Sequence, residues 1–155
     1  MYCDSIGHRL KTINNLVKRN VDKMIGHKPD KATLMHAWIM AFLTRREKDG
    51  LDTFQKDIEK EFSMNRSTTS EMLKLMANHG MIERIVVGRS KKIVLTSLGK
   101  ECHHKNELMI SSIHNLLMDG FDDDEIALLS QYCDRMIENL KRGLYSGKPD
   151  FCSFL

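Results

Sequence analysis

Two clusters of polar and basic side chains have the types and spacing that binding to duplex DNA requires. The first cluster lies at the start of a helix expected over residues 66–79, on the side away from its apolar residues, and comprises Asn65, Arg66, Ser67, Thr68, Ser70 and Lys74. Serine and threonine hydroxyls can contact bases or phosphates, and an arginine can bind a guanine edge through two hydrogen bonds or hold a phosphate. Ser67 and Thr68 could also only cap the helix, but free N–H groups at a helix start attract anions as well.

The second cluster lies on an expected hairpin, with strands over 81–87 and 92–96 and a turn over 88–91. Its members are Arg84, Arg89, Ser90, Lys91 and Lys92. Gly88 permits a tight turn, and Arg89 at the tip could enter a minor groove, where the potential is most negative. Lys91 and Lys92 would hold flanking phosphates, which would make the affinity strongly dependent on salt. A basic turn that is merely solvated is the alternative.

The elements that position these clusters follow one another in the order of a winged helix-turn-helix. A short helix over 51–62, with Asp52 and Gln55 at the spacing of a capping box, precedes a break over 63–65 and the helix over 66–79. That second helix could be capped by Asn65, or by Thr68 together with Glu71. Gly80 stands where a helix ends in a left-handed residue. This order predicts a device that reads duplex DNA.

Four further helices are expected around this centre, over 6–26, 31–50, 97–118 and 122–143. Their apolar residues recur at helical spacing, and glycines stand near their ends. The first helix and the last two carry more apolar surface than a small core needs, which predicts a dimer interface. A larger single core is the alternative.

Composition narrows the functional class. The 155 residues suffice for one core, and the net charge of only +3 means that the distribution of charge, not its sum, indicates nucleic acid. The four cysteines are widely spaced, and neither a membrane span nor a signal peptide is recognisable, so we expect a cytoplasmic protein with reduced thiols. Cys102, His103 and His104 are adjacent, and neighbouring helical residues point about 100° apart, so no metal site is predicted. No catalytic constellation and no cofactor site is recognisable, so we expect a protein that is not an enzyme.

The sequence resembles the MarR family of bacterial transcriptional regulators over residues 6–142. The segments that carry the resemblance are 65–70, 80–84 and 92–99, together with the segment 33–43 that contains His36 and Trp38. The resemblance implies a mainly α fold with a small β-hairpin wing (α+β). It also implies one domain over 1–155, with a winged helix-turn-helix lobe at 30–99 and a helical dimerisation region at 5–26 and 97–142.

The resemblance further implies a homodimer that binds pseudo-palindromic operators, represses nearby genes and is released by a small molecule. In such regulators effectors bind between the helical base and the winged lobe. The candidates for lining that cleft are Met35, His36, Trp38, Cys102 and His103. A run of methionine and aromatic side chains is otherwise ordinary core.

Two alternatives remain open within the same fold. Oxidant-sensing members of the family carry a reactive cysteine in the first helix, and Cys3 lies near that end, but the second helix lacks a supporting tyrosine. A winged-helix module that binds protein would need an apolar recognition face, against which Arg66 and Lys74 argue. The expected wing is short and has Val87 and Gly88 where the family commonly has aspartate, so the helix is expected to supply most of the specificity.

Overall fold

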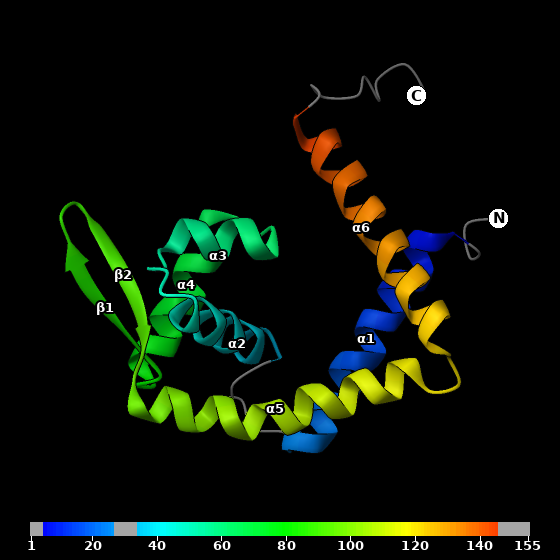
Figure 1. Cartoon of the computed structure of the whole chain (residues 1–155), viewed down its shortest axis with the longest axis horizontal. Coiled ribbons are helices and arrows are strands. Elements are labelled where there is room, and N and C mark those ends of the chain that lie inside the picture. The colour runs from blue at the N-terminus through cyan, green and yellow to red at the C-terminus, as the bar shows by residue number, and fades with distance from the viewer. Residues whose placement is uncertain (1–4, 27–33, 146–155) are drawn as a thin grey trace. The chain divides into compact units, whose positions relative to one another are not determined.

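The computed structural model describes residues 5–26 and 34–145. These ranges form helices and one antiparallel hairpin (Figure 1), which confirms the predicted mainly α fold with a β-hairpin wing. The elements are α1 (Ile6–Ile25), α2 (Leu34–Lys48), α3 (Gln55–Phe62), α4 (Arg66–Asn78), β1 (Ile82–Val87), β2 (Ser90–Leu95), α5 (Ser97–Met118) and α6 (Asp123–Tyr145).

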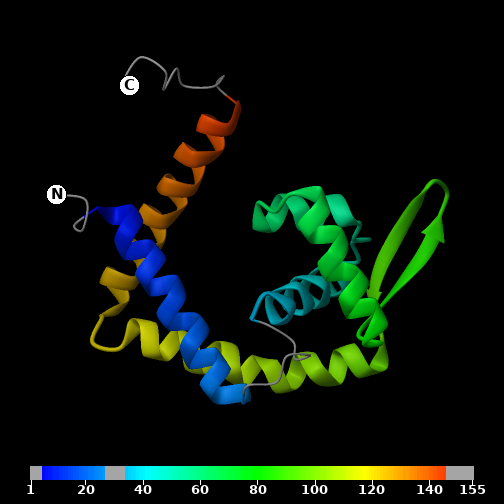
Figure 2. The same ribbon diagram turned by 180° about the vertical axis from the view of Figure 1, so that it is seen from behind.

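The chain divides into two compact units, Met1–His114 and Asn115–Leu155. The first contains α1 to α4, the hairpin and most of α5, and the second contains the end of α5 and all of α6. We call α2, α3, α4 and the hairpin the winged lobe. In it α3 packs against α4, and the hairpin contacts all three helices, while its tip extends away from them (Figures 1 and 2).

The core of the winged lobe is built mainly from α2, α4 and the base of the hairpin. Its fully buried members include Ile39, Met40, Leu73, Met76 and Ile82. Burying such side chains stabilises the fold by about 1.5–3 kcal/mol each. The expectation that the apolar residues of α2 share one buried side is wrong for Trp38, which is 40% exposed, while the polar His36 is buried.

The helix-turn-helix has the predicted break but a later start. Ser63 ends α3 in a left-handed conformation (φ 50°), and the Asn65 side chain accepts a hydrogen bond of 2.8 Å from the Thr68 N–H. The predicted helix start at 51–52 and the Asp52–Gln55 capping box are wrong. The Asp57 carboxylate accepts from the Phe54 N–H at 2.8 Å, and this local bond fixes Phe54 as the residue before α3.

The hairpin is tighter than the sequence suggested. Val87 pairs with Ser90, so the turn contains only Gly88 and Arg89, and the predicted strand start at Lys92 is wrong. Among these turn residues only Gly88 has a positive φ, of 60°, which is the pattern of a type II′ turn. The right-handed twist of the strands favours such a turn, so pairing continues to its edge.

The last two helices begin as local capping chemistry dictates. The Thr96 hydroxyl accepts from the Gly99 N–H at 3.0 Å, and Asp122 and Glu125 form a reciprocal capping box. The predicted end of α6 at Gly143 is wrong, because the helix continues to Tyr145. A lone glycine costs a helix only about 1 kcal/mol, which is not enough to end it.

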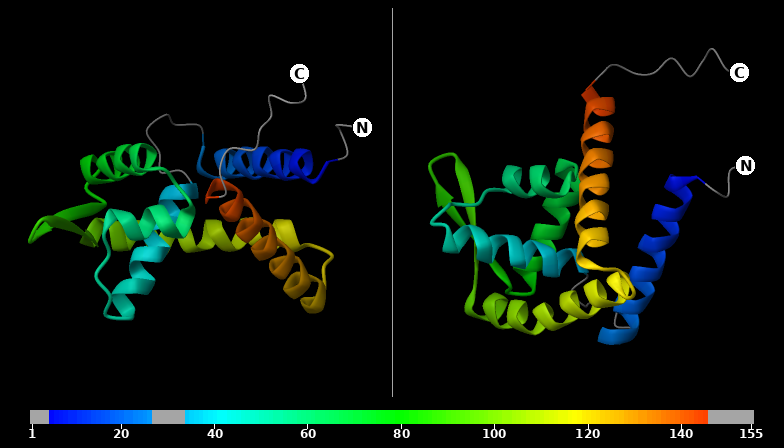
Figure 3. Two further views of the ribbon diagram at one scale, coloured as in Figure 1. Left: turned by 90° about the horizontal axis from the view of Figure 1, so that it is seen from above. Right: turned by 45° about the vertical axis from the view of Figure 1, so that its right-hand side comes forward.

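α6 buries none of its side chains in the chain itself, and Figure 3 shows it (orange) as one continuous helix. Several of its large apolar side chains are exposed to solvent, among them Leu128, Tyr132, Ile137, Leu140 and Leu144. In the described ranges, no helix is both long enough and apolar enough to span a membrane.

Candidate nucleic-acid interface

An open groove of about 730 Å³ lies between the start of α3, the outer side of α4 and the hairpin. It brings together residues that are far apart in the sequence. Of the predicted DNA-binding residues, those that line it are Arg66, Ser70, Arg84, Arg89, Ser90 and Lys91. Four of these six carry a positive charge, and with Lys56 the five cations of the lining outnumber its two carboxylates, Asp57 and Glu59. The groove can therefore hold a polyanion through charge-assisted hydrogen bonds.

The start of α4 is held rigidly while its outer side stays accessible. Besides the cap on Thr68, the Thr69 hydroxyl donates to the Asn65 carbonyl at 2.8 Å, and Thr69 is fully buried. Arg66, Ser67, Thr68 and Lys74 are exposed. Asn65 therefore acts first as the helix cap, and the exposed side chains around it are free to reach a ligand.

Arg84 has a different environment from the other cations of the groove. Its guanidinium Nη2 lies 3.4 Å from the Ser70 carbonyl oxygen, to which it donates, and its Nε is buried with no hydrogen-bond partner among the described residues. The side chain therefore ties β1 to α4 from inside the groove.

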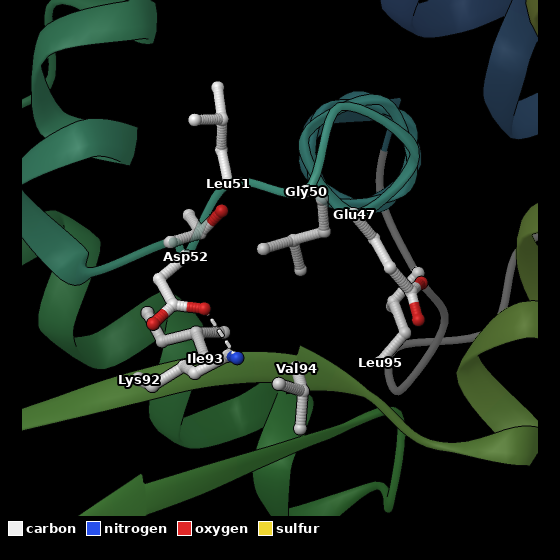
Figure 4. A pocket seen from close by; sticks show the side chains of 10 residues that line it. Glu47, Gly50, Leu51, Asp52, Lys92, Ile93, Val94 and Leu95 are labelled. Atoms are coloured by element: carbon white, nitrogen blue, oxygen red, sulfur yellow. Dashed lines mark ion pairs between the residues drawn. The ribbon is translucent and has the colours of Figure 1, made fainter. Parts of the chain in front are cut away.

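Lys92 lies outside the groove. Its Nζ is 2.5 Å from the Asp52 Oδ1, and the side chain lines a smaller pocket of about 200 Å³ on the α2 side of the hairpin (Figure 4). Leu43, Glu47 and Leu51 also line that pocket. The structure thus separates two neighbouring lysines that the sequence could not distinguish.

Sequence reasoning missed six residues that line the groove, and all but one of them lie in or directly before α3: Phe54, Gln55, Lys56, Asp57, Glu59 and Ile93. The Gln55 Nε2 donates to the Glu59 Oε1 at 2.9 Å and to the Arg66 carbonyl at 3.2 Å, so it joins α3 to the start of α4. The start of α3 at residue 55 is the feature that could have identified them. Side chains in the first turn of α3 lie beside the start of α4, as the Gln55 hydrogen bond to Arg66 shows.

The predicted effector residues do not gather in either described pocket. Met35 and Cys102 pack against the core, and Trp38 is partly exposed. Burial, with a smaller effect from His79, lowers the pKa of His36 below its usual value. His103 lies 3.5 Å from the Glu107 carboxylate. Their role in effector binding stays a prediction.

The remaining candidate sites are a redox thiol and a metal-binding cluster. Cys3, the candidate redox thiol, lies outside the described residues. In the ranges that the structure covers, no three histidine, cysteine or acidic side chains are arranged to hold a metal ion.

Comparison with solved structures identifies the fold. No family model and no curated protein matches the sequence. The transcription regulator MarR from Oenococcus oeni is 26% identical, with a TM-score of 0.71, over 86% of this chain and 99% of that one. This chain has the MarR fold.

Two other solved structures of similar fold contain a bound partner, DNA in one and a natural ligand in the other. The S. aureus MepR–DNA complex has a TM-score of 0.75 and 20% identity over 88% of this chain and 96% of that one. The PcaV transcriptional regulator from Streptomyces coelicolor, in complex with its natural ligand, has a TM-score of 0.75 and 15% identity over 89% and 95%. The predicted MarR-type winged helix is thus confirmed, and the expectation of a non-enzymatic protein agrees with neighbours that are transcriptional regulators.

Proposed function

We propose that this MarR-type chain is a sequence-specific, double-stranded-DNA-binding transcriptional regulator that works as a homodimer in the cytoplasm. The observation that carries the proposal is the groove in which Arg66 of α4 and Arg89 and Lys91 of the hairpin converge beside the exposed start of α4. A helix of this kind reads base edges in a major groove, and basic residues beside it fix the register on the phosphates. The DNA-bound MepR neighbour supports the proposal.

The homodimer is proposed from the exposed apolar side chains of α1 and α6. Along α1 the open residues include Ile6, Leu10, Ile13 and Leu16, each at least 44% exposed. Apolar rows on two long helices indicate that another protein surface covers them, and a second copy gives the symmetry of a pseudo-palindromic operator. Two recognition helices one helical turn apart would lie about 34 Å from each other.

We further propose that the protein represses transcription and that a small molecule releases it. The PcaV neighbour, which holds its natural ligand, supports a small-molecule effector.

DNA binding is tested by titrating the protein against genomic fragments that it retains, at several salt concentrations. Arg66→Ala, Arg89→Ala and Lys91→Ala should each weaken binding and each lower the slope of log K against log salt by about 1. Lys105→Ala is the matched control, since Lys105 is an exposed cation outside the groove. If the variant with all three substitutions still retained the fragments at every salt concentration, the assignment would be refuted.

The homodimer is tested by sedimentation of the wild type and of Leu140→Glu. Leu140 is 70% exposed, so the change costs the monomer little, whereas a charge in an apolar interface should dissociate the dimer. A wild type that sediments as a monomer, or a variant that still dimerises with unchanged affinity, would count against this interface.

A further inference from the structure

Lys92 belongs to a network of bonds that fastens the wing to α2. Its side chain is 33% exposed, and its Nζ lies 2.5 Å from the Asp52 Oδ1, in the α2–α3 connection. Phe54 of the same connection forms an isolated antiparallel bridge with Lys92, and the Ile93 N–H donates to the Thr53 carbonyl at 2.8 Å. The connection therefore acts as a short third strand beside β2.

The connection is itself fixed to α2 through Arg46. The Arg46 guanidinium donates to the Asp52 carbonyl at 2.6 Å and to the Thr53 hydroxyl at 2.9 Å. It also lies over the Phe42 ring, with 5.7 Å to the ring centre. Since Thr53 and Phe42 are buried, the Asp52 carboxylate is presented to Lys92 from a rigid support.

Lys91 and Lys92 differ because successive strand residues point to opposite faces. Lys91 is exposed and lines the groove with Arg66 and Arg89. Lys92 lines the pocket on the α2 side, where Figure 4 shows its ammonium directed to Asp52. Its charge is already paired with a carboxylate, so a DNA phosphate would have to compete with Asp52 for the ammonium.

We propose that Lys92 and Asp52 are a positioning pair that sets the angle of the wing relative to α4, and that Lys92 is not a phosphate contact. The proposal rests on the proposed DNA-binding function. It assigns Lys91 and Arg89 to the DNA and Lys92 to the orientation of the strand that carries them. It departs from the expectation, drawn from sequence, that both lysines hold phosphates, and the experiment below distinguishes the two.

The test is fluorescence anisotropy with a labelled duplex from the retained fragments. It uses Lys92→Met, Asp52→Asn, the double variant, and the charge swap Asp52→Lys with Lys92→Asp. Lys92→Met and Asp52→Asn should weaken binding equally, by about two- to fivefold, the range of a partly exposed ion pair. The double variant should be no weaker than either, and the swap should restore part of the affinity. The salt slope should stay unchanged throughout.

Lys91→Met is the matched control and should lower the salt slope by about 1. If Lys92 were a phosphate contact, Lys92→Met would lower the slope as Lys91→Met does. Asp52→Asn would then strengthen binding, because it removes a negative charge near the DNA. The swap would weaken binding more than Lys92→Met does, because it places a carboxylate at the phosphate. Any of these three results overturns the proposal.

Amide hydrogen exchange in the free protein separates this proposal from the proposed function. The Ile93 N–H should exchange faster in both single variants than in the wild type, and its protection should return in the swap. Unchanged exchange in both singles would overturn the positioning role. Failure of the wild type to bind any duplex would refute the proposed function instead, whatever the exchange shows.

Discussion

Replacing Gly99 by alanine tests the closest approach between α5 and the junction that precedes the wing. Gly99 is buried in the first turn of α5. A Cβ at this position would lie 2.0 Å from the Met81 carbonyl oxygen and 3.0 Å from the Leu95 Cδ2. Ordinary contacts of a Cβ begin near 3.4 Å, so the backbone at Met81 would have to move by more than 1 Å.

The expected magnitude combines three effects. In an open helix, glycine to alanine stabilises by about 1 kcal/mol. Here overpacking opposes that gain by about 1–3 kcal/mol. The Met81 carbonyl also accepts the Thr96 N–H at 3.1 Å, and loss of that bond costs about a further 1 kcal/mol. Gly99→Ala should therefore destabilise the protein by about 1–3 kcal/mol, a fall in melting temperature of about 2–12 °C at this chain length.

Urea unfolding followed by far-UV circular dichroism measures the change. Gly143→Ala is the matched control, because Gly143 is also helical and a Cβ there meets nothing within 4 Å. That variant should be neutral or more stable by up to about 1 kcal/mol. If Gly99→Ala stabilises as much as Gly143→Ala, the close packing of α5 on Met81 is wrong.

Three further predictions concern the winged lobe. Leu73→Ala should lower the unfolding free energy by about 2–5 kcal/mol, since Leu73 is fully buried. Leu75→Ala on the same helix should lower it far less, because Leu75 is 44% exposed. Equal losses would contradict the assignment of Leu73 to the buried side of α4 and of Leu75 to its exposed side. Asn65→Ala should lower the unfolding free energy by about 1 kcal/mol, because it removes the cap of α4. Asn65→Asp should keep most of that stability, because aspartate also caps helices, and thermal melts of the two variants will measure the difference. The lowered pKa of His36 means that the unfolded chain binds more protons than the folded one below the usual value of 6.5, so stability should fall as the pH drops from 6.5 towards the folded pKa. His36→Gln should flatten that dependence in urea titrations between pH 5 and 7, and the exposed His114→Gln should not; a slope that survives His36→Gln would show that another group causes it.

Features set by neighbouring residues could be predicted from the sequence. The break between α3 and α4 and the cap by Asn65 depend on bonds that span at most three or four residues. The same holds for Thr96 before α5 and for Asp122 before α6. Where two capping pairs with the same spacing were possible, the sequence could not show which one starts the helix. At α3 the structure has the bond between Asp57 and Phe54 and not the Asp52–Gln55 pair.

The mutual placement of the side chains needed the tertiary structure. The sequence by itself determined that Arg66, Arg89 and Lys91 lie on a polar helix start and a basic hairpin, because residue type and period fix each element separately. Only packing decided that they line one groove and that Lys92 turns to Asp52 on the opposite side. Those contacts join residues that are distant in the chain, and their formation depends on how α2, α4 and the hairpin share one core, which no local pattern encodes.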